Sequence, residues 1–290
     1  MSMTIPVIIF TFLFSTASAG NKLNIIVTIA PQAEFVEKIG GEYVNVSVMV
    51  PAAGNPHTYE LTPSQLKDVR NADLYFKLGS GIEFELMWMD KIASINKGLT
   101  IIDNSAGITL IDNEDKEGGH LPGTGHYHGP KDPHIWLSPK NAVIMIGSIK
   151  NALIARDPGR ADVYQKNAEV YINELNSLDR EIRDKLKDKK KRVFMVFHPA
   201  WAYFARDYGL KEIAIESEGK EPTIAGLKSI IDTAKESGIK VIFISPQFST
   251  RSAEVVAKET GCKIVAVDDL SKDYTGNMRR VAGVLKEGID

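Results

Sequence analysis

Hydrophobic and polar positions along the chain indicate short strands that alternate with helices. Largely apolar runs of strand length are separated by segments in which apolar residues recur every three or four positions. The first half contains such runs at residues 23–29, 44–50, 74–78 and 99–102. The second half contains them at residues 192–197, 210–215, 240–245 and 263–267. This alternation favours parallel sheets with helices on both faces.

Two helix starts carry clear capping signals. Thr62 precedes Pro63 and lies three residues before Gln65, which is the pattern of a capping box with proline at the first helical position. Ser138 followed by Pro139 predicts a second start of the same kind. Further helices are expected at residues 32–39, 201–208, 223–237 and 250–259 and from residue 274 onward.

A long helix is predicted between the two halves. Apolar residues recur there at steps of four and three, on one helical face: Tyr164, Ala168, Tyr171, Leu175, Leu178, Ile182 and Leu186. A helix over residues 161–188 would be about 40 Å long, enough to cross two lobes. The alternative is a long surface helix of a single lobe. We expect two similar α/β lobes, each with a mainly parallel sheet flanked by helices, joined by this helix.

The expected boundaries start with a signal peptide. Residues 1–19 contain no charged side chain, include the apolar run 5–14 and end in Ala17-Ser18-Ala19, which is typical of a signal peptidase site. The apolar run is too short to span a bilayer, although an uncleaved anchor is the alternative. No cysteine follows it for lipid attachment, so we expect a soluble protein in the periplasm or elsewhere outside the cytoplasm. The remaining boundaries are expected at residues 20–157 for the first lobe, 158–191 for the helix and 192–290 for the second lobe.

Composition narrows the class of partner. The 290 residues are 43% hydrophobic and 25% charged, which is typical of a globular protein long enough for two cores. The formal net charge of -2 gives no attraction for nucleic acid. Cys262 is the only cysteine and therefore cannot form a disulfide within the chain. We expect a monomer that does not bind nucleic acid.

Three histidines stand beside a proline, on loops that lead into predicted helices. They are His57, His134 and His198. Neutral imidazole is a common zinc ligand, and ligands of α/β folds bind at the carboxyl ends of strands. The three are roughly 65 to 80 residues apart, which excludes a small zinc-finger loop. We therefore expect the fold to assemble them into one metal site in the cleft between the lobes.

A carboxylate from the second lobe is the expected fourth ligand. The predicted strand at residues 263–267 is followed by Asp268 and Asp269. Asp268 is the first residue past the strand and would complete a tetrahedron of three histidines and one aspartate. The alternative is that one of these aspartates only caps the following helix.

A second group of histidines lies in the segment 112–132. His120, His126 and His128 occur there among glycines and acidic residues, with few apolar residues to pack. We expect a mobile loop. It would be either a secondary, weaker metal site or a solvated linker in which the histidines are incidental.

Four segments together resemble the metal-binding periplasmic component of zinc and manganese ABC uptake transporters, the cluster A-I substrate-binding proteins. They are residues 54–63, 132–139, 198–209 and 267–271. The resemblance implies that His57, His134, His198 and Asp268 bind the metal, and a histidine at the third position is similar to the zinc-type members. Leu61, Ser138 and Asp269 depart from the family pattern, which leaves the choice between Asp268 and Asp269 open.

The resemblance implies a protein that captures Zn²⁺ with high affinity and delivers it to the permease of an ABC transporter. Alternatives are a member that binds Mn²⁺ or Fe²⁺, and a metal-binding adhesin or buffer. A zinc hydrolase is disfavoured because Asp268 would fill the open coordination position and because no HExxH motif accompanies the histidines. We therefore do not expect an enzyme.

Overall fold

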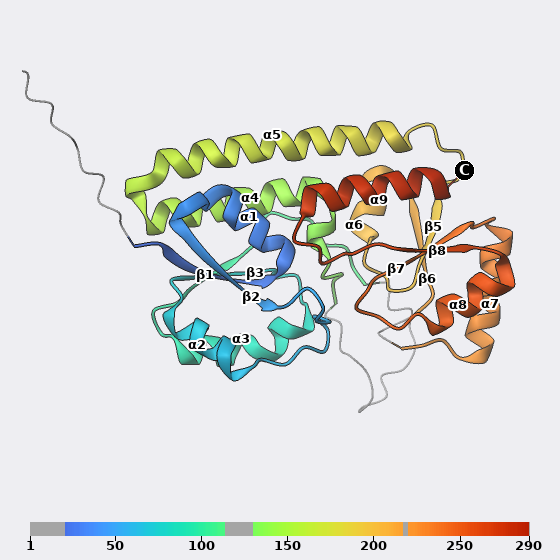
Figure 1. Cartoon of the computed structure of the whole chain (residues 1–290), viewed down its shortest axis with the longest axis horizontal. Helices are drawn as coiled ribbons and strands as arrows, with labels where there is room; N and C mark the ends of the chain where they lie inside the picture. Colours follow the sequence, from blue (N-terminus) through green and yellow to red (C-terminus); the bar gives the residue numbers. More distant parts are fainter. Residues whose placement is uncertain (1–20, 114–129, 217–219, 290) are drawn as a thin grey trace, which may run out of the picture.

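Two α/β lobes lie side by side, with one long helix running across both (Figure 1). The computed structural model describes residues 21–113, 130–216 and 220–289. Each lobe has a four-stranded sheet, and every strand pairing is parallel. The predicted fold class is confirmed.

The two sheets share one strand order. The strands of the first sheet run in the order β2-β1-β3-β4, and their bounds are β1 (Leu23–Ile29), β2 (Val44–Val50), β3 (Leu74–Lys77) and β4 (Thr100–Asp103). The strands of the second sheet run in the order β6-β5-β7-β8, and their bounds are β5 (Val193–Val196), β6 (Lys211–Ala214), β7 (Val241–Ile244) and β8 (Lys263–Ala266). Because the strands of a sheet are parallel, all of its carboxyl ends lie at one edge, where ligands of such folds bind.

The helices of the first lobe are α1 (Ala30–Gly40), α2 (Pro63–Asn71), α3 (Glu83–Ile95) and α4 (Pro139–Arg156), with short 3-10 turns η1 (Gly41–Tyr43), η2 (Ile135–Leu137) and η3 (Pro158–Arg160). Both predicted caps are present: the side chain of Thr62 accepts from Gln65 N, and that of Ser138 accepts from Asn141 N. Helix α3 was not predicted. It buries the acidic Glu83 and Glu85, so its sequence lacks the usual amphipathic pattern.

The long helix α5 (Ala161–Leu186) packs on the first lobe through α1 and α4, and on the second through α6 and α9 (Figure 1). All seven apolar positions predicted to share one face are buried. The helices of the second lobe are α6 (Ala202–Tyr208), α7 (Ile224–Glu236), α8 (Arg251–Thr260) and α9 (Tyr274–Gly288). The alternative of a helix that belongs to one lobe alone is therefore wrong.

A buried carboxylate joins three helices along this side of the molecule. Glu34 of α1 accepts a hydrogen bond from the hydroxyl of Tyr171 in α5 at 2.7 Å and one from the backbone N–H of Tyr274 in α9 at 2.5 Å. Burial raises the pKa of Glu34. The contact ties the first lobe, the long helix and the last helix of the second lobe together.

Two predictions lie outside the described residues, namely the signal peptide at residues 1–19 and the histidines His120, His126 and His128 of the segment 112–132. The lobe boundaries at residues 20–157, 158–191 and 192–290 stay predictions. In the described part of the chain, no helix combines the length and apolar character needed to span a membrane.

Candidate metal centre

The three proline-flanked histidines lie on loops that the fold brings together from both lobes. His57 lies on the loop between β2 and α2, and its backbone N–H donates to Asn55 Oδ1 at 2.9 Å. The backbone N–H of His134, just before η2, donates to Asp132 Oδ1 at 2.8 Å. His198 follows the end of β5. These bonds hold the first two loops in turns that direct their rings inward.

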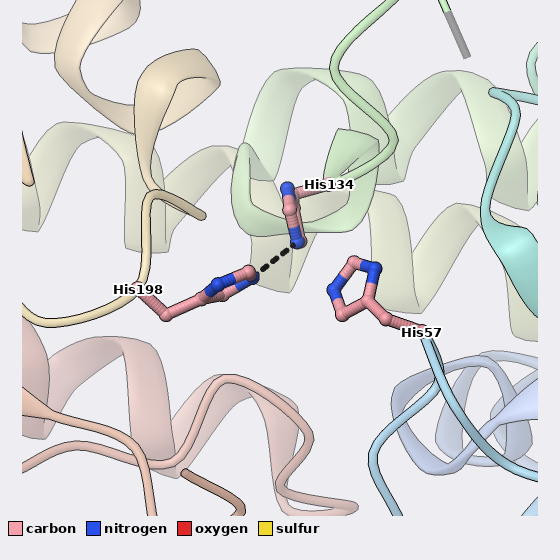
Figure 2. A group of neighbouring side chains, drawn as sticks. All are labelled: His57, His134 and His198. Atoms are coloured by element: carbon pink, nitrogen blue, oxygen red, sulfur yellow. Dashed lines mark hydrogen bonds between the residues drawn. The ribbon is translucent and has the colours of Figure 1, made fainter. Parts of the chain in front are cut away.

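The three imidazoles face one another (Figure 2). One ring nitrogen from each of His57, His134 and His198 lies within 4.8 Å of the corresponding nitrogens of the other two. The ring centroids are 4.9 to 5.4 Å apart, and the residues are only 3 to 5% exposed. Three buried ring nitrogens that converge on one point form a candidate site for a divalent cation.

Each of these imidazoles is paired with a carboxylate through Nδ1. His57 Nδ1 lies 2.6 Å from Glu83 Oε2, and His134 Nδ1 lies 2.9 Å from Asp132 Oδ1. His198 Nδ1 is hydrogen-bonded to Glu216 Oε1. A carboxylate at Nδ1 accepts the ring proton and leaves the Nε2 lone pair for a metal, as is usual for histidine ligands of zinc. These carboxylates favour, for each ring, the tautomer whose Nε2 can bind a metal.

Strand register explains the pairing of His198 with Glu216. In the β5–β6 ladder Val196 lies opposite Ala214. Two residues further along each strand direction, His198 therefore lies opposite Glu216. The backbone N–H of Glu216 donates to Phe197 O at 3.0 Å, which continues the ladder past the strand ends. Glu83 and Glu216 were not predicted from the sequence, because each is distant along the chain from the histidine that it contacts. Of the three carboxylates, only Asp132 had a local signal, because it lies two residues before His134.

The two aspartates after β8 differ in their surroundings. Asp268 is half-buried, and its Oδ1 accepts from Gln247 Nε2 and from the backbone N–H of Leu270, both at 3.0 Å. It is not a member of the histidine group, and its role as a ligand stays a prediction. Asp269 is 4% exposed, and its Oδ1 has no hydrogen-bond partner among the described residues. Burial raises the pKa of the Asp269 carboxyl to about 6, although the nearby His134 and a hydrogen bond from Ser245 act to lower it.

Aromatic side chains enclose the histidines. Phe248 stacks on the ring of His198 with a centroid distance of 4.1 Å and an interplanar angle of 18°. Trp136 lies 5.3 Å from the ring of His134, and its Nε1 donates to the backbone oxygen of Asp269 at 2.7 Å, which links the two lobes. These rings reduce access of water to the histidines, so electrostatic interactions with a bound cation are stronger than in bulk solvent.

The chain is similar in sequence to proteins of a zinc-uptake family. The sequence model of the family described as zinc-uptake complex component A, periplasmic, matches residues 25–288. The zinc-binding lipoprotein AdcA of Streptococcus pneumoniae strain ATCC BAA-255 / R6 is 32% identical over 287 residues, which is 94% of this chain and 57% of AdcA. The chain therefore spans little more than half the length of that relative.

Two further similarities extend over nearly the whole of both proteins. The high-affinity zinc uptake system protein ZnuA of Bacillus subtilis strain 168 is 30% identical over 284 residues, which is 95% of this chain and 88% of that protein. A crystal structure of ZnuA has a TM-score of 0.86 and 39% sequence identity to this chain, and the alignment covers 93% of this chain and 100% of the other. The two-lobed fold is thus shared with a solved protein of this family.

Proposed function

We propose, for a chain that belongs to the family of periplasmic zinc-uptake complex component A, that its role is to capture Zn²⁺ outside the cytoplasmic membrane and deliver it to the permease of an ABC transporter. Family membership confirms the resemblance inferred from the sequence. We propose three points about the role of this chain: that it captures a metal ion, that the ion is Zn²⁺, and that its partner is a permease.

The observation that supports this role best is the set of three histidines with carboxylates at Nδ1. His57, His134 and His198 come from both lobes, and each is oriented by its own acidic partner. Such oriented ligands lose little conformational freedom when an ion binds, which favours high affinity. Because the ligands come from two lobes, a small relative shift of the lobes would withdraw a ligand and release the ion.

The ligand set favours zinc over manganese. Three imidazole nitrogens suit Zn²⁺, whereas Mn²⁺ prefers carboxylate, carbonyl and water oxygens. We therefore assign Zn²⁺ as the transported ion. A member that carries Mn²⁺ or Fe²⁺ is the alternative, and competition between the metals decides between them.

We propose that the fourth ligand is one of the two aspartates after β8. Asp269 is buried, lies close enough to His134 to interact electrostatically with it, and has an unpartnered oxygen among the described residues. Asp268, the choice from the sequence, already accepts two hydrogen bonds through Oδ1. These contacts favour Asp269. A carboxylate here would close a four-ligand site, which retains an ion without leaving a position for catalysis.

We also propose a secondary zinc site in the segment 112–132. Its histidines His120, His126 and His128 would bind zinc weakly, in addition to the ion held by His57, His134 and His198. Deletion of residues 117–129 tests this: the number of zinc ions bound at saturation should fall relative to the full chain. An unchanged stoichiometry would reject the secondary site and leave the main one in place.

The main proposal is tested by metal binding to the purified chain. Elemental analysis of the variant that lacks residues 117–129 should show one bound ion per chain, and titration should show Zn²⁺ displacing Mn²⁺. His57→Ala and His198→Ala should each weaken binding at least about 100-fold, since each removes a buried ligand. If both variants keep the affinity of the unchanged chain, the proposed site is wrong.

Binding should also stabilise the fold by mass action. At a free zinc concentration of about 100 Kd the gain is about 2.7 kcal/mol, which corresponds to a rise in Tm of roughly 5–10 °C for a chain of this size. The rise should be absent in His57→Ala. Co-purification of a permease with the zinc-loaded chain, from membranes of the cells that produce it, would establish the partner.

A further inference from the structure

One loop of the second lobe contacts several parts of the metal centre. The segment at residues 245–250, which connects β7 to α8 and which we call the β7–α8 loop, carries Ser245, Gln247 and Phe248. Ser245 lies close enough to the carboxyl group of Asp269 to act on its pKa.

We propose that Phe248 and Gln247 are positioning residues that set how fast the bound ion escapes. The inference rests on the proposed function, because it assumes that zinc binds the three histidines. It goes beyond that function by assigning control of the dissociation rate to two residues that bind no metal.

Phe248 covers one face of a histidine. Its ring lies nearly parallel to that of His198 at 4.1 Å and also lies 6.4 Å from the ring of His57, so it is placed against a histidine from each lobe. The ring centroid of Phe197, the residue before His198, lies 6.3 Å from that of Phe248. A stacked ring restricts rotation of the imidazole of His198 and occupies space through which water would reach the ion.

Gln247 connects the same loop to both lobes. Its Nε2 donates to the backbone oxygen of Ala52 in the first lobe at 2.8 Å and to Asp268 Oδ1 in the second lobe at 3.0 Å. Ala52 lies in the loop after β2 that also carries His57. The bond therefore fixes the β7–α8 loop relative to the His57 loop and, through its neighbour, holds Phe248 against His198.

The physical consequence concerns rates. An ion leaves such a site when water replaces its protein ligands one at a time, and the hydrophobic shell around a metal controls that access. Without the Phe248 ring, His198 can rotate away and water can enter on the exposed face. The ligands themselves remain, so the ion still binds, but it should dissociate faster.

The test is the dissociation rate of zinc from the loaded full chain. The loaded protein is mixed with a chromophoric chelator at concentrations high enough that the observed rate no longer depends on the chelator. Phe248→Leu should raise the dissociation rate at least about 10-fold, within the range found for residues around metal ligands, while the association rate changes less than about 3-fold. Phe248→Tyr, which keeps a ring to stack, should stay within about 3-fold of the unchanged chain.

The matched control is Phe204→Leu. Phe204 is buried in the same lobe, and its ring contacts are to Trp201 and Tyr208. The Phe204→Leu substitution should lower the Tm of the metal-free protein and leave the rate of zinc dissociation unchanged. If Phe248→Leu leaves the rate within about 2-fold of the unchanged chain, or if Phe204→Leu raises it equally, the inference is overturned.

Gln247→Leu tests whether the two residues act through one loop. It should also speed release, and the double variant should release zinc more slowly than the product of the two single effects predicts, because coupled residues are not additive. Fully multiplicative effects would overturn the coupling. Absence of stoichiometric zinc binding by the unchanged chain would instead reject the proposed function, so the two failures are distinguishable.

Discussion

The Nε2 atoms of His134 and His198 lie 3.2 Å apart, although the two residues come from different lobes (Figure 2). Both rings have a carboxylate at Nδ1, so in the neutral state both Nε2 atoms carry lone pairs. Two lone pairs at this distance repel unless a proton or a cation lies between them. The geometry therefore makes a proton and a metal ion competitors for the same place.

This competition predicts that zinc affinity falls with pH. Imidazoles bind metal only when neutral, and binding releases protons. Lowering the pH from about 7.5 to about 5.5, across the range in which imidazoles usually titrate, should weaken affinity at least about 10-fold. Competition titrations at each pH measure it. Calorimetry in buffers of different ionisation enthalpy should detect the released proton, and a flat affinity profile would contradict the argument.

The carboxylates behind the rings should matter almost as much as the ligands. Glu216→Gln keeps the size of the side chain but removes the charge that orients the proton on His198 Nδ1, so zinc affinity should fall about 10–100-fold. Glu34→Gln is the control, because Glu34 is a buried carboxyl that accepts hydrogen bonds from Tyr171 and Tyr274 and not from a histidine of the metal site. Equal losses in both variants would mean that general destabilisation, not ligand orientation, is responsible.

Substitution distinguishes the two aspartates after β8. Asp269→Asn should weaken zinc binding about 10-fold or more, since it removes a buried charge near His134. Asp268→Asn should change affinity less than about 3-fold, because an amide oxygen can still accept the bonds from Gln247 and Leu270. The opposite ranking would establish Asp268, the residue expected from the sequence, as the ligand.

Glu212 should make the metal-free fold less stable as pH rises. Burial raises its pKa to about 8 from the ordinary 4.5, even though the backbone N–H groups of Ala200 and Trp201 donate to it. Between these two values the unfolded chain has lost this proton and the folded chain retains it. Stability from this group is therefore highest below about pH 4.5 and declines up to about pH 8.

Glu212→Gln removes this dependence. At pH 8 the variant should be more stable than the unchanged chain by on the order of 4 kcal/mol, and at pH 4.5 the gain should be small. Urea unfolding of both proteins, with a chelator present, measures the difference at each pH. A difference that does not grow with pH would show that Glu212 ionises normally in the folded chain.

The connection between the lobes predicts a small structural response to zinc. Helix α5 packs on both lobes, and Glu34 joins α1, α5 and α9 along the same side. A wide hinge opening would break these buried contacts. Small-angle scattering should therefore show little change in the radius of gyration between metal-free and zinc-loaded protein, and a large change would show that these contacts break when zinc leaves.

Much of the fold was predictable because its signals are local. Strand-length apolar runs, the Thr62 and Ser138 caps and the buried stripe of α5 each depend on residues within a few positions of one another. Helix α3 was missed because its start buries Glu83 and Glu85 while Leu86 and Met87 are exposed, which reverses the pattern from which helices are predicted.

The metal site was likewise predictable only where its signals are local in the sequence. The sequence by itself determined which three histidines to consider, because His57, His134 and His198 stand beside prolines on loops before helices, and loops of this kind converge at the carboxyl ends of strands. Only the tertiary structure decided that Glu83 and Glu216 orient two of the rings, that Phe248 stacks on His198, and that Asp269 is buried more deeply than Asp268. The physical reason is that strands, helix starts and turns follow from neighbours along the chain, whereas contacts between distant side chains and the burial of individual polar residues depend on strand register and on how the two lobes pack.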